Sequence, residues 1–174
     1  KNNSWSKYNT LYNLYKKAET PFGWYKKIFN FCKKEKIIVF ASVFDFKSLE
    51  ILEKLNCPAY KIASPEITDI PLIKKIAKTK KTIIISNGLA NLKDLELAVK
   101  TVKKANNKYL IILKCTSAYP APLEEVNLDT MHDINKKFKC LVGFSDHTLG
   151  YDIAVHAASK GAIMLEKHVC LKST

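Results

Sequence analysis

The chain has 174 residues and 47% of them are hydrophobic, so it can bury the core of one domain and is not a disordered tail. No apolar run approaches the roughly 18 residues that span a bilayer, and the first residues do not form a signal sequence, so we expect a cytoplasmic protein without a membrane partner. The net charge is +13, but all 29 basic residues are lysines, and groups of them, such as those at 74–81 and 100–104, fall on expected helix surfaces and helix ends. The absence of arginine argues against nucleic acid as a partner.

Apolar runs rich in isoleucine, valine and leucine recur along the chain. They predict six buried strands, at residues 37–40, 60–63, 82–85, 109–113, 141–144 and 162–165. The segments between them have helical spacing. Their ends carry helix signals: Asp69 with Pro71 before one helix, Asn91 before the next, and Gly161 after the last.

Alternating strands and helices predict a parallel α/β sheet, either doubly wound or a (β/α)8 TIM barrel. The strand count favours an incomplete barrel with about six of the eight strands. Either architecture places the chemistry at the carboxyl ends of the strands, because all the parallel strands end on the same edge of their sheet.

Two histidines follow the last two predicted strands. His147 lies in GFSDHTLG at 143–150, and His168 ends LEKH at 165–168. One helix-sized segment separates them, so both imidazoles are expected at one rim. Two neutral imidazoles there are suited to a divalent metal. His132 and His156 fall in predicted helices away from the rim, and we expect neither to bind metal.

Hydroxyl side chains follow one predicted strand after another. They are Ser42, Ser64, Ser86, Thr116 with Ser117, and Ser145. One such serine indicates only a turn, but several at equivalent positions beside Lys61 predict a binding site for a phosphate or a carboxylate. Cys115 is close to the same rim, where we expect a buried and inert thiol.

These segments resemble the barrel domain of the sialic acid synthase family. The matching motifs run in family order from about Leu11 to His168. They are FD at 44–45, PAYKIAS at 58–64 with Glu66, IIIS at 83–86 with Gly88, KCTSAYPAP at 114–122, GFSDHTLG at 143–150 and EKH at 166–168. Within the family the chain is most similar to the pseudaminic acid synthase branch. Lys114 stands where the sialic acid branch usually has histidine, and LYNLY at 11–15 and TPF at 20–22 with Trp24 indicate the same branch.

The resemblance implies a role for each matched residue. His147 and His168 correspond to the protein ligands of a divalent cation, commonly Mn²⁺, with Mg²⁺ or Co²⁺ as alternatives. The positions that hold the phosphate and carboxylate of phosphoenolpyruvate correspond to Lys61, Ser42, Ser64, Ser86, Ser117 and Ser145. Glu66, Tyr119 and Asp146 correspond to active-site residues around the sugar and the reacting carbons.

The implied reaction condenses phosphoenolpyruvate with an amino sugar, a 2,4-diacetamido-2,4,6-trideoxyhexose, and releases phosphate. The family barrel has two further strands before the first one here, and a small antifreeze-like domain after the last. We therefore expect residues 1–174 to be a partial TIM-barrel synthase domain from a longer polypeptide, inactive or nearly so in isolation. The resemblance implies a homodimer for the complete protein.

Two alternatives remain open from the sequence. Within enzymes, the sugar is instead that of an N-acetylneuraminate or legionaminate synthase. From another class, the chain is a non-catalytic piece of a barrel that binds an anionic partner without turnover, a hypothesis motivated by the missing strands and the basic charge.

Overall fold

The chain divides into two compact units, Lys1–Val39 and Phe40–Thr174. The computed structural model describes residues 10–171, so both ends of the domain expected at 1–174 lie outside the described residues. The first unit contains α1 (Leu11–Ala18) and α2 (Phe22–Lys34). Helix α1 begins after Thr10, whose side chain accepts a hydrogen bond from the backbone N–H of Asn13.

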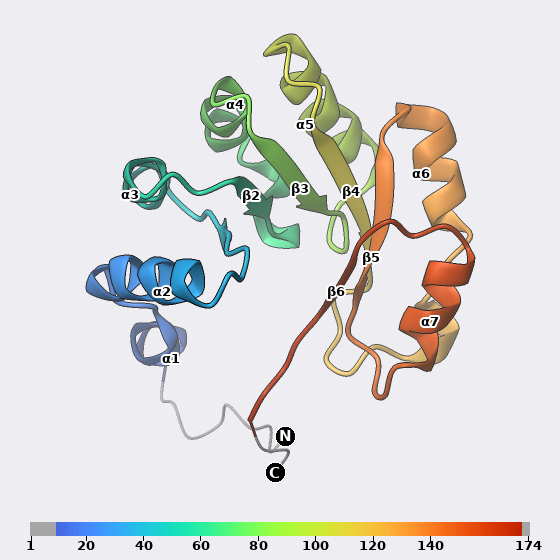
Figure 1. Ribbon diagram of the computed structural model, residues 1–174. Coiled ribbons are helices and arrows are strands. Elements are labelled where there is room, and N and C mark those ends of the chain that lie inside the picture. The colour runs from blue at the N-terminus through green and yellow to red at the C-terminus, as the bar shows by residue number, and fades with distance from the viewer. Residues whose placement is uncertain (1–9, 172–174) are drawn as a thin grey trace. The chain divides into compact units, whose positions relative to one another are not determined.

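The second unit is a curled parallel sheet that forms a half-barrel (Figure 1). Its six strands are β1 (Ala41–Ser42), β2 (Ala59–Ile62), β3 (Thr82–Ser86), β4 (Leu110–Cys115), β5 (Leu141–Asp146) and β6 (Leu165–Lys167). Every strand pairs in parallel with the next one along the chain, in the order β1-β2-β3-β4-β5-β6. A doubly wound sheet reverses its strand order, so the structure confirms the incomplete barrel.

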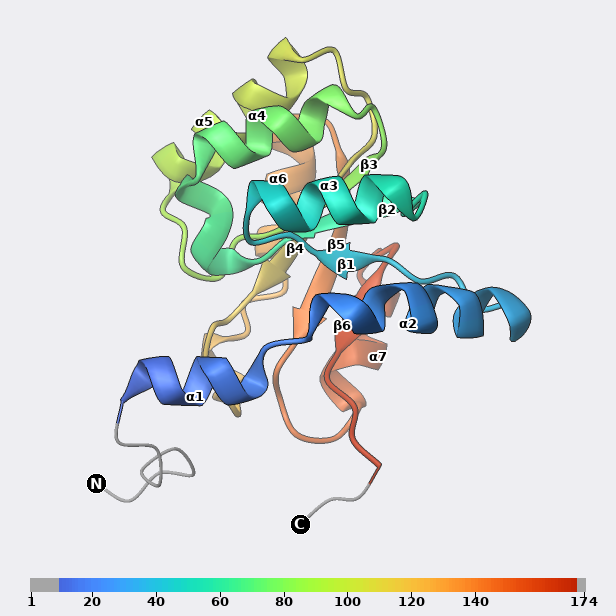
Figure 2. The same cartoon turned by 90° about the vertical axis from the view of Figure 1, so that its left-hand side faces the viewer.

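Helices connect the strands along the outer side of this sheet. They are α3 (Phe46–Lys54), η1 (Ser64–Thr68), α4 (Ile70–Lys78), α5 (Leu92–Lys104), η2 (Leu123–Glu125), α6 (Thr130–Phe138) and α7 (Asp152–Ser159). Figure 2 views this unit from the side of α3 and α4, which lie in front of the strands. The capping signals are confirmed: Asp69 accepts from Leu72 N–H, Asn91 and Asp94 form a capping box, and Gly161 follows α7 with a φ of 91°.

Side chains on the central strands alternate between two apolar layers. On β3, Ile83 and Ile85 alternate with Ile84, which belongs to a buried cluster with Ile111 and Leu113. Helices contribute the other part of the core, for example Leu72, Ile73 and Ile76 of α4 and Leu95, Val99 and Val102 of α5. Burial on both faces explains why these strands read as continuous apolar runs.

The predicted bounds of the two edge strands were wrong. Residues 37–40 do not pair with β2, whose ladder begins with Ala41 opposite Tyr60, and β6 begins at Leu165 opposite Phe144, where the predicted strand at 162–165 ends. Strand β6 is also not buried, since Leu165 is 44% exposed. Apolar runs report burial, whereas strand bounds depend on the hydrogen-bonded neighbour, and an edge strand has only one.

Gly143 lets β5 pack closely against Met164, the residue before β6. A Cβ atom there would lie 2.3 Å from the carbonyl oxygen of Met164 and 2.7 Å from Leu113 Cδ2. We expect Gly143→Ala to destabilise the fold by about 3 kcal/mol, because a backbone carbonyl must move. Urea unfolding measures this. Gly23→Ala is the control, since nothing lies within 4 Å of its Cβ position, and an equal loss in both variants would contradict the explanation.

Between residues 10 and 171, no helix combines the length and the apolar composition that crossing a bilayer requires.

Candidate active site

The predicted polar residues lie at the carboxyl ends of the strands, several of them opposite one another. Ser42 of β1 lies opposite Lys61 of β2, and Ser145 of β5 lies between Cys115 of β4 and Glu166 of β6. Residues paired in a parallel sheet face the same side, and the register continues from Lys61 through Ile84 to Ile111, which has the same parity on β4 as Cys115. The two groups therefore face the same side of the half-barrel on different rungs of the sheet.

A cavity of about 550 Å³ opens at this edge of the sheet. Nine of the eleven sequence-predicted site residues line it: Ser42, Lys61, Ser64, Ser86, Ser117, Tyr119, Ser145, His147 and His168. The other two, Glu66 and Asp146, are not among its lining residues, although their chain neighbours Pro65, Ser145 and His147 are. Residues that are far apart in the sequence therefore converge as the barrel interpretation predicts.

The two imidazoles lie together at this mouth. The ring centroids of His147 and His168 are 5.3 Å apart, and the Tyr119 ring lies 4.1 Å from the first and 5.4 Å from the second. His132 and His156 are exposed on α6 and α7 and do not line the cavity, as expected. Three aromatic rings from three different strand ends thus gather at one side of the cavity.

The orientation of His147 is set by the loop that follows β4. Its Nδ1 lies 2.8 Å from the carbonyl oxygen of Thr116, and its own carbonyl oxygen accepts from Ala121 N–H at 2.9 Å. Since a carbonyl oxygen only accepts, Nδ1 carries the proton and Nε2 keeps its lone pair. Burial lowers the pKa of His147, which favours the neutral form that binds metals.

The donor set fits a divalent cation. With metal–nitrogen distances of about 2.0–2.1 Å, two imidazoles on one ion have ring centres roughly 5 Å apart, close to the 5.3 Å found here. Across residues 10–171, no group of three or more His, Cys, Asp or Glu side chains is arranged to hold a metal. An ion held by these two histidines would therefore keep positions open for oxygen atoms of a substrate or of water.

Lys61 is the buried cation of the cavity. Its side chain is 7% exposed, and its Nζ lies 3.6 Å from Glu166 Oε1. Burial lowers the pKa of Lys61, while Glu166 acts in the opposite direction. A buried ammonium that faces a cavity is a strong attractor for an anion.

Several hydroxyl groups line the same cavity as Lys61. Ser64 Oγ accepts from Gly88 N–H at 2.9 Å, and a Cβ at Gly88 would lie 2.3 Å from Ser117 Oγ, so this glycine lets the loop after β3 approach the serines. Ser86 Oγ is buried and has no hydrogen-bond partner among the described residues. A buried hydroxyl without a partner can donate a hydrogen bond to an oxygen atom of a ligand.

Glu66 lies in η1, directly after the Lys61 strand. Its Oε2 is buried and makes no hydrogen bond within residues 10–171. Burial raises the pKa of Glu66, and the charge of Lys61 opposes that shift. A carboxylate with a raised pKa is suited to exchanging protons near neutral pH.

Asp146 is fully buried and does not line the main cavity, but it lines a smaller pocket together with Tyr119, His147 and His168. One oxygen accepts from the backbone N–H and the hydroxyl of Thr148, at 2.8 and 2.7 Å, and the other is 2.7 Å from Lys167 Nζ. Burial alone would raise the pKa of Asp146, but the hydrogen bonds from Lys167 and Thr148 outweigh it and hold the pKa below its usual range. In this arrangement Asp146 shapes the loop that carries His147.

Removing this carboxylate is expected to be costly. Asp146→Ala leaves the buried Thr148 groups without their acceptor, so we expect a loss of about 3 kcal/mol in urea unfolding at neutral pH. Because the folded-state pKa of Asp146 is lowered, its contribution is present above the ordinary aspartate pKa of about 3.9 and is lost as the pH falls through the lower folded value.

Asp129→Ala is the matched control for this prediction. Asp129 pairs with Lys160 at 2.6 Å, but its side chain is 89% exposed, so its removal should hardly change stability. Equal effects of the two substitutions would contradict the role given to Asp146.

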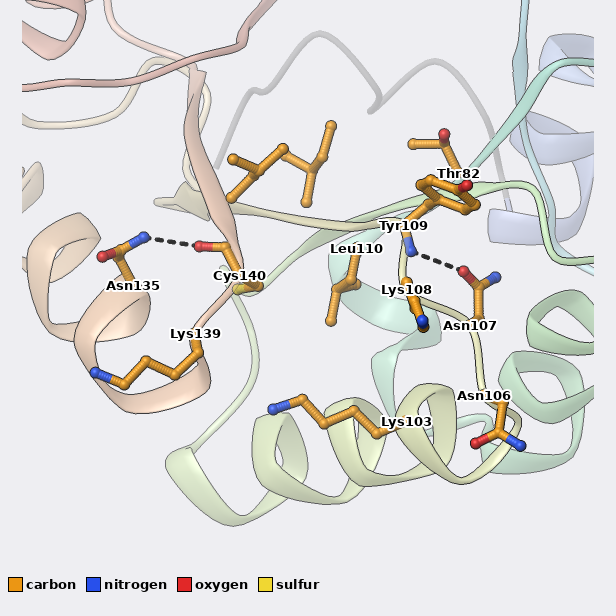
Figure 3. A pocket seen from close by; sticks show the side chains of 12 residues that line it. Thr82, Lys103, Asn106, Asn107, Lys108, Tyr109, Leu110, Asn135, Lys139 and Cys140 are labelled. Atoms are coloured by element: carbon orange, nitrogen blue, oxygen red, sulfur yellow. Dashed lines mark hydrogen bonds between the residues drawn. The ribbon is translucent and has the colours of Figure 1, made fainter.

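A larger cavity, of about 730 Å³, lies at the opposite ends of β3, β4 and β5 (Figure 3). Its polar side chains form hydrogen bonds with the backbone. Lys103 donates to the carbonyl oxygen of Phe138, Asn135 donates to that of Cys140, and Asn107 accepts from Tyr109 N–H. Lys103 and Lys139 also lie at the carboxyl ends of α5 and α6, where cations stabilise the helix. None of the predicted site residues lines this cavity.

Sequence reasoning missed Glu166 and Lys167, which both line the main cavity. The signal was available in the two-residue period of a strand, because Glu166 relates to His168 as Ser145 relates to His147. Cys115 is buried as expected, with its Sγ 3.9 Å from His147 Nδ1.

A parallel half-barrel with a polar cavity at the carboxyl ends of its strands defines an α/β-barrel protein. The model of the NeuB family matches residues 1–174, and the chain belongs to this family.

Individual relatives agree with this assignment. The chain is 44% identical to the pseudaminic acid synthase of Helicobacter pylori over 170 residues, which are 98% of this chain and 50% of that protein. It is 40% identical to the N,N'-diacetyllegionaminic acid synthase of Campylobacter jejuni over 160 residues, 91% of this chain and 48% of that protein. The chain thus spans about half the length of these curated relatives.

A solved structure supports the fold. The N-acetylneuraminic acid synthetase of Leptospira borgpetersenii, crystallised in complex with citrate, superimposes with a TM-score of 0.89 at 31% identity. The match covers 98% of this chain and 60% of that one.

Proposed function

We propose that the complete protein condenses phosphoenolpyruvate with 2,4-diacetamido-2,4,6-trideoxy-altrose to form pseudaminate and phosphate. The observation that carries this proposal is the convergence of His147 and His168 with Lys61 and the ring of serines on one cavity. The identity to the Helicobacter pylori pseudaminic acid synthase supports the choice of sugar.

Lys61 and the serine hydroxyls bind the phosphate and carboxylate groups of phosphoenolpyruvate in this proposal. The ammonium offers a charge in a place shielded from water, and Ser86 Oγ offers a hydroxyl with no other partner among the described residues. Such groups keep the enol phosphate in one orientation while its charge changes.

His147 and His168 hold the divalent cation, with Mn²⁺ as the proposed ion. When bound, the cation supplies positive charge to the aldehyde oxygen of the sugar, which becomes negative as C3 of phosphoenolpyruvate attacks the aldehyde carbon. The hydrogen bond from His147 Nδ1 to Thr116 keeps the other ring nitrogen directed away from the loop backbone.

Glu66 is the proposed proton acceptor. After carbon–carbon bond formation, water adds to C2 and one of its protons passes to Glu66, which returns it to the oxygen of the former aldehyde as the new hydroxyl forms. The remaining C2 hydroxyl gives its proton to the departing phosphate as the C2–O bond to phosphate breaks, which leaves the ketone. The buried Oε2 and the raised pKa of Glu66 suit this exchange. In this proposal Tyr119, whose ring lies 4.1 Å from that of His147, contacts the sugar.

The assay that tests this proposal uses the complete protein with Mn²⁺, phosphoenolpyruvate and each sugar separately. We expect equal amounts of phosphate and the nine-carbon acid from the altrose derivative. Absence of product with that sugar refutes the proposed activity.

The second candidate is a legionaminate synthase, favoured by the 40% identity to the Campylobacter jejuni enzyme. It predicts faster turnover with the corresponding legionaminate precursor in the same assay. The comparison of initial rates at equal sugar concentration separates the two.

A further inference from the structure

Glu166 already occupies the part of the cavity where an anion is expected to bind. Its Oε1 accepts a hydrogen bond from Ser145 Oγ at 2.7 Å and lies 3.6 Å from Lys61 Nζ. One carboxylate oxygen therefore contacts both an ammonium and a hydroxyl of the predicted anion site.

This contact crosses the half-barrel. Lys61 is on β2 and Glu166 is on β6, and β3, β4 and β5 lie between them in the sheet. The register between β5 and β6 puts Glu166 directly beside Ser145, whereas it reaches Lys61 only across the curl of the sheet. The side chains of β2 and β6 therefore face each other across the cavity.

The burial of the two partners is unequal. The Lys61 side chain is 7% exposed and that of Glu166 is 35% exposed. A buried ammonium is costly without a counter-ion, so Glu166 stabilises the empty site. Because Glu166 reaches solvent, it can turn away at a much smaller desolvation cost than Lys61.

A substrate anion that binds to Lys61 comes close to the carboxylate of Glu166. Two like charges within about 5 Å repel each other strongly even at an effective dielectric constant of about 20. Phosphate therefore cannot bind to Lys61 Nζ and Ser145 Oγ while Glu166 keeps its present contacts with the same two atoms.

We infer that Glu166 is an internal counter-ion of Lys61 which an anionic substrate group must displace and which returns to Lys61 when the phosphate leaves. It is a positioning residue for Lys61 and Ser145. The inference rests on the proposed function only for the location of the substrate anion, and its test requires no turnover.

The test is isothermal titration of the complete protein with inorganic phosphate, without sugar or metal. Glu166→Gln keeps the acceptor for Ser145 and removes the charge. We expect its Kd for phosphate to fall about tenfold below that of the wild type, because an intramolecular competitor has been weakened. Damage to the fold would instead weaken binding. Glu166→Asp retains the charge and should stay closer to the wild type than to Glu166→Gln.

Glu50→Gln is the matched control, since it breaks an ion pair with Lys75 outside the cavity and should leave the Kd unchanged. Weaker or unchanged phosphate binding in Glu166→Gln overturns the inference, as does a wild type that does not bind phosphate.

A crystal structure of the wild type with phosphate provides a check independent of any variant. Glu166 is expected to have left Lys61, and phosphate bound beside an intact Lys61–Glu166 pair would overturn the inference.

Discussion

Replacing His168 or His147 with alanine is expected to weaken Mn²⁺ binding to the complete protein by more than about 100-fold and to abolish product formation. The two rings are 5.3 Å apart, so each supplies one of two nitrogen donors to a shared ion. Loss of either leaves one imidazole, which is a weak site. Isothermal titration with Mn²⁺ measures the affinity, and phosphate release measures the activity.

His156→Ala and His132→Ala are the matched controls. Both side chains are exposed on helices and line no part of the cavity, so Mn²⁺ affinity should not change. If Mn²⁺ affinity were equal in the wild type and in both cavity variants, the non-catalytic interpretation would be favoured.

Lys61→Met is expected to reduce kcat/KM for phosphoenolpyruvate by about 100- to 1000-fold. Methionine fills a similar volume but removes the buried ammonium that faces the substrate anion. The remaining Glu166 reaches solvent, so the fold should tolerate the substitution better than the activity does. Steady-state kinetics with varied phosphoenolpyruvate, together with urea unfolding, separates these two effects.

Lys75→Met is the control for the removal of one lysine. Lys75 makes an exposed ion pair with Glu50 at 2.8 Å and lies outside the cavity, so kcat/KM should remain within about twofold. Similar losses in both variants would show that net charge, rather than the position of Lys61, controls the reaction.

The sequence was sufficient to predict the parallel sheet and the convergence of most of the predicted polar residues on one cavity. Central strands such as β3 and β4 are buried on both faces, so their apolar runs were recognised, and the caps at Asp69 and Asn91 marked helix starts correctly. The convergence of the serines with Lys61 follows from parallel topology alone, because every strand ends on the same edge.

Contacts across the half-barrel were beyond this reasoning. Glu166 is adjacent to Ser145 by register, but its pairing with Lys61 depends on how strongly the sheet curls. Asp146 stays a predicted active-site residue, and the sequence did not indicate that its oxygens are engaged by Thr148 and Lys167. The spacing of apolar residues determines neither how strongly the sheet curls nor the direction of a side chain after the end of a strand.

The most direct test of the central claim is an anomalous difference map from crystals of the complete protein grown with Mn²⁺ and phosphoenolpyruvate. The account predicts one strong manganese peak bonded to Nε2 of His147 and to His168, with the phosphate beside Lys61 and the serines. A manganese peak elsewhere, or phosphoenolpyruvate bound outside this cavity, would contradict it.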